Sequence, residues 1–99
     1  MLKVKPGVRL LGLQPPMLVA LNAVKDAYDN LGVDCVITSA TDGNHSSGSW
    51  HHAGLAMDFR TRHLTSAQKK ALTGTVKKSL PEFDVVLESS HLHVEYDPK

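Results

Sequence analysis

The sequence has little of several features that mark other classes of protein. Cys35 is the single cysteine, so the chain can form neither an internal disulfide nor a zinc site built on several cysteines. Aromatic residues make up only 5% of the chain, and no apolar run is long enough to cross a bilayer. The net charge of +1 provides no basic surface for nucleic acid or for an anionic membrane. We therefore expect neither nucleic-acid binding nor membrane insertion.

The length and composition predict one compact domain spanning residues 1–99. The 99 residues suit a single domain, and 41% hydrophobic with 21% charged residues is ordinary for a globular protein. Residues 1–7 lack the apolar run of a signal peptide, so we expect a protein made and folded in the cytoplasm. Nothing in the sequence requires more than a monomer.

Two helices are indicated by their end signals and by apolar residues at helical spacing. The first begins at the prolines 15 and 16, because proline suits the first helical turn, and ends at Gly32. The second begins at Thr65, which forms a capping-box pattern with Gln68, and ends before Pro81. Their apolar faces are predicted core residues: Met17, Leu21, Val24, Tyr28 and Leu31 in the first, and Leu72, Val76 and Leu80 in the second.

Strand-forming residues are concentrated at 33–38, 55–60, 84–88 and 91–96, and residues 8–11 are also expected to be extended. The resulting order is helix, strand, loop, strand, helix, strand, strand. This order predicts an α+β domain in which helices pack on one face of an antiparallel sheet. The other face of such a sheet can remain open and display a site.

Alternation along two strands predicts which side chains lie on that open face. Asp58 lies on the face opposite to the apolar residues of its strand. In the last strand, His91, His93 and Glu95 share one face, and the apolar residues between them face the core. The open face is therefore expected to carry Asp58, His91 and His93, joined by His51 from the preceding loop.

Histidine is the prominent residue type, with six in 99 residues. Together, His51, Asp58 and His93 would provide three zinc ligands and leave a fourth position open for water, as catalytic zinc requires. Gly54 and Ala56 are small, so the backbone between the first two ligands can turn and pack closely. The sequence has no H-E-x-x-H, which excludes the helical zinc-protease arrangement.

The order of these residues resembles a known family. The pattern Ser49-x-His51-x-x-Gly54-x-Ala56-x-Asp58, followed by His91-x-His93, is similar to that of the zinc D-Ala-D-Ala carboxypeptidase family. That family includes bacterial cell-wall peptidases and bacteriophage L-alanyl-D-glutamate endolysins, and the signalling domain of Hedgehog proteins shares its fold and zinc site. The Hedgehog pattern resembles Gly43-x-His45-Ser46-x-x-Ser49-x-His51, then Asp58, then Glu88-Ser89-x-His91-x-His93. The resemblance covers about residues 33 to 96.

The resemblance implies a zinc-dependent peptidase that cleaves a D-amino-acid-containing bond in peptidoglycan stem peptides. It further implies a phage-type cell-wall endopeptidase or a DD-carboxypeptidase. The small size and the lack of a signal-peptide pattern favour a phage-encoded protein that acts on the cell wall. Residue by residue, the resemblance implies the zinc ligands His51, Asp58 and His93, the proton-accepting Glu88, the oxyanion-stabilising His91, and the site-lining His45 and Ser49.

Two departures from the family pattern leave alternatives open. Many family members carry an arginine before the first zinc histidine that grips a substrate carboxylate, and residues 38–43 contain none. This favours cleavage within a peptide. Some members have an E-x-x-H spacing, under which Glu88 would pair with His91 as the ligand in place of His93.

Further alternatives concern single residues and the function as a whole. His52 is an alternative ligand to His51. Arg60 and Arg62 follow Asp58 and are interpreted as solvated charges, with contact to substrate carboxylates as the alternative. A non-catalytic zinc-binding module of the same fold is the alternative to an enzyme.

Overall fold

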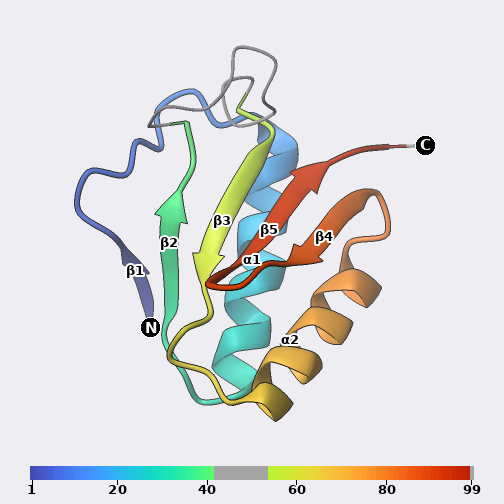
Figure 1. The fold of residues 1–99 in the computed structure, drawn as a ribbon. Helices are drawn as coiled ribbons and strands as arrows, with labels where there is room; N and C mark the ends of the chain where they lie inside the picture. Colours follow the sequence, from blue (N-terminus) through green and yellow to red (C-terminus); the bar gives the residue numbers. More distant parts are fainter. Residues whose placement is uncertain (42–53, 99) are drawn as a thin grey trace.

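The computed structural model describes residues 1–41 and 54–98 (Figure 1). Two helices and five strands follow one another along this part of the chain. Their bounds are β1 (Leu2–Val4), α1 (Pro15–Asn30), β2 (Cys35–Ser39), β3 (Ala56–Arg60), α2 (Ser66–Ser79), β4 (Phe83–Leu87) and β5 (His91–Tyr96).

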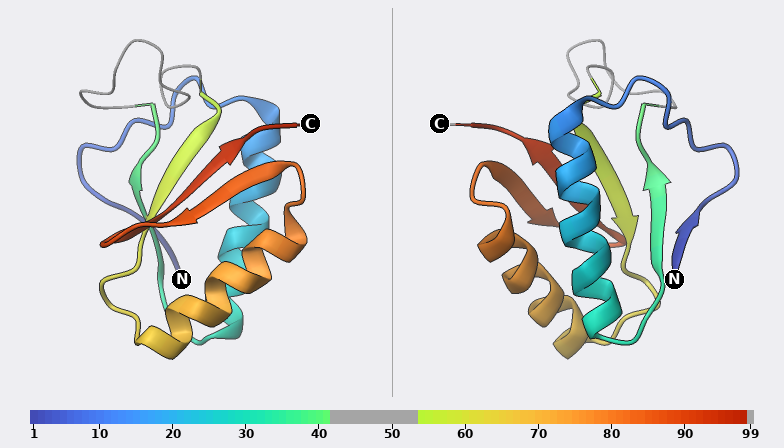
Figure 2. Two further views of the ribbon diagram at one scale, coloured as in Figure 1. Left: turned by 45° about the vertical axis from the view of Figure 1, so that its right-hand side comes forward. Right: turned by 180° about the vertical axis from the view of Figure 1, so that it is seen from behind.

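The strands form one sheet in the order β1-β2-β3-β5-β4, and both helices lie on the same side of it (Figures 1 and 2). The predicted α+β fold is therefore confirmed. The expectation of an antiparallel sheet is correct for β2 to β5 but wrong at one edge, because β1 runs parallel to β2. The sheet is consequently mixed, and its face opposite the helices carries the candidate site.

The first strand forms earlier in the chain than the extended segment predicted at residues 8–11. The amide of Cys35 donates to the carbonyl of Met1 at 3.0 Å, and the amide of Lys5 donates to that of Ile37 at 2.9 Å. These bonds satisfy backbone groups of β1 through the edge of β2. A strand of three residues is too short to show an alternating pattern, so periodicity does not predict it.

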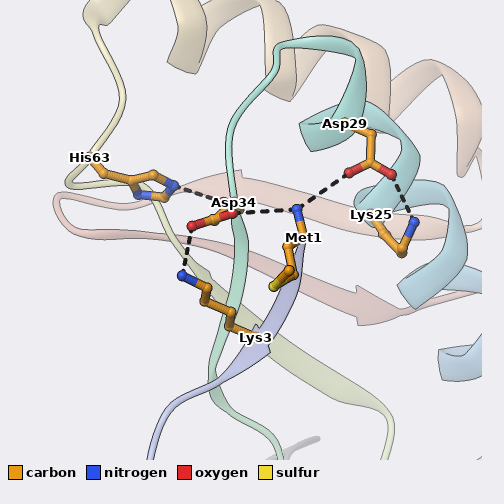
Figure 3. Close-up of polar contacts among 6 residues, drawn as sticks. All are labelled: Met1, Lys3, Lys25, Asp29, Asp34 and His63. Atoms are coloured by element: carbon orange, nitrogen blue, oxygen red, sulfur yellow. Dashed lines mark hydrogen bonds and ion pairs between the residues drawn. The ribbon is translucent and has the colours of Figure 1, made fainter.

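Side-chain contacts also join β1 to the start of β2 (Figure 3). The Lys3 ammonium lies 2.9 Å from the Asp34 carboxylate, and this contact lowers the pKa of that carboxyl. The amino group of Met1 lies 3.4 Å from the same carboxylate. From the other side, His63 donates to the Asp34 carbonyl at 2.8 Å and stacks on Tyr28. His63 therefore has a structural contact away from the candidate site.

Both helices begin and end as the sequence predicts. Helix α1 starts at Pro15, and Gly32 just beyond it has a φ of +71°, a conformation that glycine adopts readily. The predicted capping box of α2 is present, since the Thr65 hydroxyl accepts from the Gln68 amide and the Gln68 side chain accepts from the Thr65 amide. Helix α2 ends at Ser79, before Pro81.

The core lies between the helices and the inner face of the sheet. The helices contribute fully buried Met17, Val24, Tyr28 and Val76, whereas the predicted core residues Leu21 and Leu31 are only partly buried. Cys35 is buried in β2, and burial raises the pKa of its thiol to about 12, so it remains a protonated, unreactive group. Neither helix in the described part of the chain has the length and apolar character needed to cross a membrane.

Candidate metal centre

The candidate site is built on the central antiparallel pair of strands, β3 and β5. In their register Asp58 lies directly opposite His93, and Arg60 lies opposite His91. The residues that alternate with them (Met57, Phe59, Leu92 and Val94) are all fully buried in the core. The predicted placement of Asp58, His91 and His93 on the face opposite the helices is thus confirmed.

His93 is held between two carboxylates. Its Nδ1 lies 2.8 Å from Oδ1 of Asp58, and its Nε2 lies 2.7 Å from Oε1 of Glu95. A carboxylate only accepts hydrogen bonds, so both ring nitrogens donate and the ring is a cation. The hydrogen bond with Asp58 is the main cause that raises the pKa of His93 to about 9, Glu95 adds to it, and burial opposes it.

His91 lies at the margin of this cluster. Its Nε2 is 3.7 Å from the same Asp58 oxygen that His93 contacts, and its Nδ1 is 3.4 Å from the Ser90 hydroxyl. The His91 side chain is 33% exposed, compared with 13% for Asp58. One buried carboxylate oxygen therefore faces two histidines, of which His91 is the more accessible to solvent.

These donor groups fit a zinc ion. Oδ1 of Asp58 and Nδ1 of His93 share a proton in their hydrogen bond. Zinc binds the same two types of atom, a carboxylate oxygen and an imidazole nitrogen. Metal-binding histidines commonly donate their other ring N–H to a carboxylate, which is how Glu95 contacts His93. The contact fixes the ring so that Nδ1 faces Asp58. Glu95 therefore orients the His93 ring.

The described residues alone do not complete a metal site. Within residues 1–41 and 54–98, no group of three or more His, Cys, Asp or Glu side chains is arranged to hold a metal ion. The geometry of His93 explains this, because its two nitrogens face Asp58 and Glu95 on opposite sides of the ring. The other predicted site residues, His45, Ser49 and His51, and the alternative ligand His52, lie outside the described residues.

Glu88 lies just after β4, in the turn that leads into β5. Its amide donates to the His91 carbonyl at 2.8 Å, which places it across the hairpin from His91. On β4, Val86 lies opposite His93, so alternation puts Glu88 on the same face of the sheet. The Glu88 side chain is exposed, and no described residue makes a hydrogen bond or ion pair with its carboxylate. Its position is therefore at the rim of the cluster, next to His91.

The structure places Ser39 beside the candidate site, to which no sequence motif assigns it. Ser39 lies one residue beyond the predicted strand 33–38, but it ends β2 and lies opposite Asp58. An irregularity between Ile37 and Ser39 shifts the register there, so Thr38 has no partner of its own on β3. Such a bulge changes where side chains point, and it depends on strand pairing that a single sequence does not reveal.

Comparison with known proteins does not assign this chain to a family. No protein-family model matches the chain, and no curated protein matches its sequence. A proposal about function therefore depends on the geometry of the Asp58 and His93 cluster and on the motif resemblance described above.

The raised pKa of His93 leads to a prediction for the metal-free protein. Because the pKa is about 9 in the folded state and near 6.5 in the unfolded state, the protonated ring stabilises the fold. This contribution is fully present below about pH 6.5 and is lost as the pH rises through about 9. We expect the melting temperature in EDTA to fall by at least about 4 °C between pH 7 and pH 10, the shift that roughly 1 kcal/mol produces in a domain of this size.

An NMR titration of the His93 ring provides the direct measurement. Glu95→Gln serves as the comparison, since it removes the weaker of the two carboxylate partners and should lower the pKa without returning it to its usual value. A His93 ring that titrates near pH 6.5 in the unmodified protein would contradict the described contacts.

Proposed function

We propose that this protein is a zinc-dependent peptidase that hydrolyses a D-amino-acid-containing bond in peptidoglycan stem peptides, as phage-type cell-wall endopeptidases and DD-carboxypeptidases do. The observation that carries the proposal is the chain of contacts from Asp58 to His93 to Glu95. It combines two donor atoms suited to zinc with a second carboxylate that orients the ring. All three side chains lie on the sheet face opposite the helices, and 13% to 19% of each is exposed.

The proposed metal ligands are Asp58, His93 and His51, the last of which lies outside the described residues. Zinc bound there would act as a Lewis acid that polarises the scissile carbonyl. Glu95 keeps Nδ1 of His93 directed at Asp58, so the two donor atoms stay together on the sheet. Because β3 and β5 are paired on both sides by other strands, this part of the site is rigid.

Glu88 and His91 supply the remaining chemistry in this proposal. Glu88 accepts the proton of the attacking water and passes it to the leaving amine. Its exposed carboxylate at the rim beside His91 is free to approach a bound peptide from the solvent side. His91 donates to the oxyanion that develops on the scissile carbonyl, since its ring borders Asp58 and is partly exposed to solvent.

Glu88→Gln tests the catalytic assignment. We expect it to lower the rate of amine release from peptidoglycan by about 10² to 10⁴-fold, the usual contribution of a general base. Zinc content should be unchanged, because Glu88 is not a ligand. The assays are muropeptide digestion and elemental analysis of the purified protein. Glu82→Gln is the matched control, since Glu82 is also exposed but precedes β4, at its other end.

Two results would overturn the proposal in different ways. Zinc binding without any release of amines from peptidoglycan or muropeptides would identify a non-catalytic zinc-binding module. Failure of added zinc either to bind or to raise the melting temperature would remove the metal site itself.

A further inference from the structure

A second feature of the open sheet face lies beside the metal centre. It is a hollow of ≈ 320 Å³, a volume suited to a small ligand group. Arg60, at the end of β3, and His91, opposite it on β5, form one side of the hollow. The described lining residues are Lys5, Thr38, Arg60, Arg62, Ser90 and His91. His91 therefore borders both the hollow and Asp58.

The described lining of the hollow is cationic. It includes Lys5, Arg60 and Arg62, and no carboxylate of residues 1–41 and 54–98 lies in it. No carboxylate among the described residues forms an ion pair with these three side chains. Lys5 and Arg62 are exposed, so Arg62 is solvated as the sequence interpretation expects, whereas Arg60 is partly buried.

Among the three cationic side chains, Arg60 gives the strongest indication that an anion binds in the hollow. Its Nε is buried and has no hydrogen-bond partner among the described residues. A buried donor left without an acceptor costs free energy, and the cost is larger when the group is charged. An oxyanion in the hollow would supply that acceptor and could bind the planar guanidinium through two parallel hydrogen bonds.

We propose that this hollow binds a carboxylate of the peptide substrate, with Arg60 as its principal partner and with Arg62 and Lys5 adding positive charge. The inference rests on the proposed peptidase function and names its substrate class, a peptide with an anionic group near the scissile bond. Arg60 follows Asp58 by two strand residues, which is about 7 Å along β3. The carboxylate thus lies within about two residues of the bond that is cut.

The proposal is tested first by binding to the zinc-free protein, so that it does not depend on hydrolysis. NMR titrations compare N-acetyl-D-alanine with N-acetyl-D-alaninamide, which differ only in the carboxylate. We expect N-acetyl-D-alanine to shift the amide signals of Ser90 and His91, with a Kd at least about tenfold lower than that of the amide. Inorganic phosphate is the third probe and should bind no more tightly than N-acetyl-D-alanine.

Variants test whether the residues of the hollow cause the preference for N-acetyl-D-alanine over its amide. Arg60→Gln should abolish the difference between the carboxylate and the amide. Arg62→Gln should reduce it, and because Arg62 is exposed, this variant provides a test even if Arg60→Gln fails to fold. Lys77→Gln is the matched control, since Lys77 is a solvent-exposed cation on α2 and should leave the preference unchanged.

The outcomes separate this inference from the proposed function. Equal binding of the two acetylated probes, or no shift with either, overturns the carboxylate site even if the protein hydrolyses peptidoglycan. Tighter binding of phosphate that is lost in Arg60→Gln overturns the carboxylate assignment in favour of a phosphate-bearing ligand. Carboxylate binding without hydrolysis supports the site and overturns only the peptidase. In an active enzyme, Arg60→Gln should raise KM at least about tenfold with little change in kcat.

Discussion

Asp58→Asn is expected to weaken zinc binding by at least about 100-fold and to abolish peptidase activity. Tetrahedral protein zinc sites bind with about 10–16 kcal/mol, or roughly 3–4 kcal/mol for each of four ligands, and each 1.4 kcal/mol is a factor of ten in affinity. Asparagine keeps the shape of Asp58 but removes its negative charge. That charge is important because one Asp58 oxygen faces both His91 and His93.

Competition with a chromogenic chelator measures the affinity, and elemental analysis measures the metal content. Asp26→Asn is the control, because Asp26 is an exposed carboxylate on α1, on the side of the sheet away from the site. In the metal-free protein, Asp58→Asn should also lower the pKa of His93, whose largest upward contribution comes from Asp58. Unchanged zinc affinity in Asp58→Asn would place the metal elsewhere in the molecule.

Gly54→Ala is expected to cost at least about 3 kcal/mol of stability. Gly54 has a φ of +74°, a left-handed conformation that costs other residues about 1–2 kcal/mol. A methyl group there would overlap the carbonyl oxygen of Gly12 and force two backbone segments apart. The Gly54 carbonyl also accepts from the Gln14 amide at 2.9 Å, a contact that such a shift would break. Backbone strain and overlap act together at this position.

Urea unfolding of the metal-free protein measures the loss. Gly74→Ala is the matched control, because it makes the same substitution inside α2. An added methyl group there would have no neighbouring atom within 4 Å. That variant should be more stable by about 0.5–1 kcal/mol, as alanine favours the helix. Equal stability of Gly54→Ala and the unmodified protein would show that the two segments do not approach closely. A destabilised variant should also bind zinc poorly, since Gly54 leads directly into β3 and Asp58.

The local signals in the sequence predict the helices and most strands correctly because they act over a few residues. Pro15 opens α1 and Thr65 caps α2 through contacts with immediate neighbours. The predicted bounds 91–96 for the last strand are those of β5. Strand β1 was missed because its stability comes from pairing with β2, more than 30 residues away, and its three residues show no periodicity of their own.

The sequence predicts which face of the sheet carries Asp58 and His93, but not which side chains contact one another. Alternation placed Asp58 and His93 on one face, yet only the register between β3 and β5 makes them direct neighbours. The bond from His93 to Glu95 depends on the rotation of one ring, which no pattern encodes. The hollow beside Arg60 gathers residues from four separate segments of the chain, and Lys5 and Ser90 carry no motif that would connect them.

The two edge strands of the mixed sheet, β1 and β4, differ in length and in polarity. This difference determines which edge is suited to pairing with another chain. Strand β1 is three residues long, contains Lys3 and is followed by Lys5, features that discourage another chain from pairing with it. Strand β4 at the other edge has five residues, and Val86 and Leu87 in it are 46% and 40% exposed. An apolar edge strand is a template on which a further strand can add. Of the two edges, β4 is therefore the one at which we expect a second copy of the chain to add.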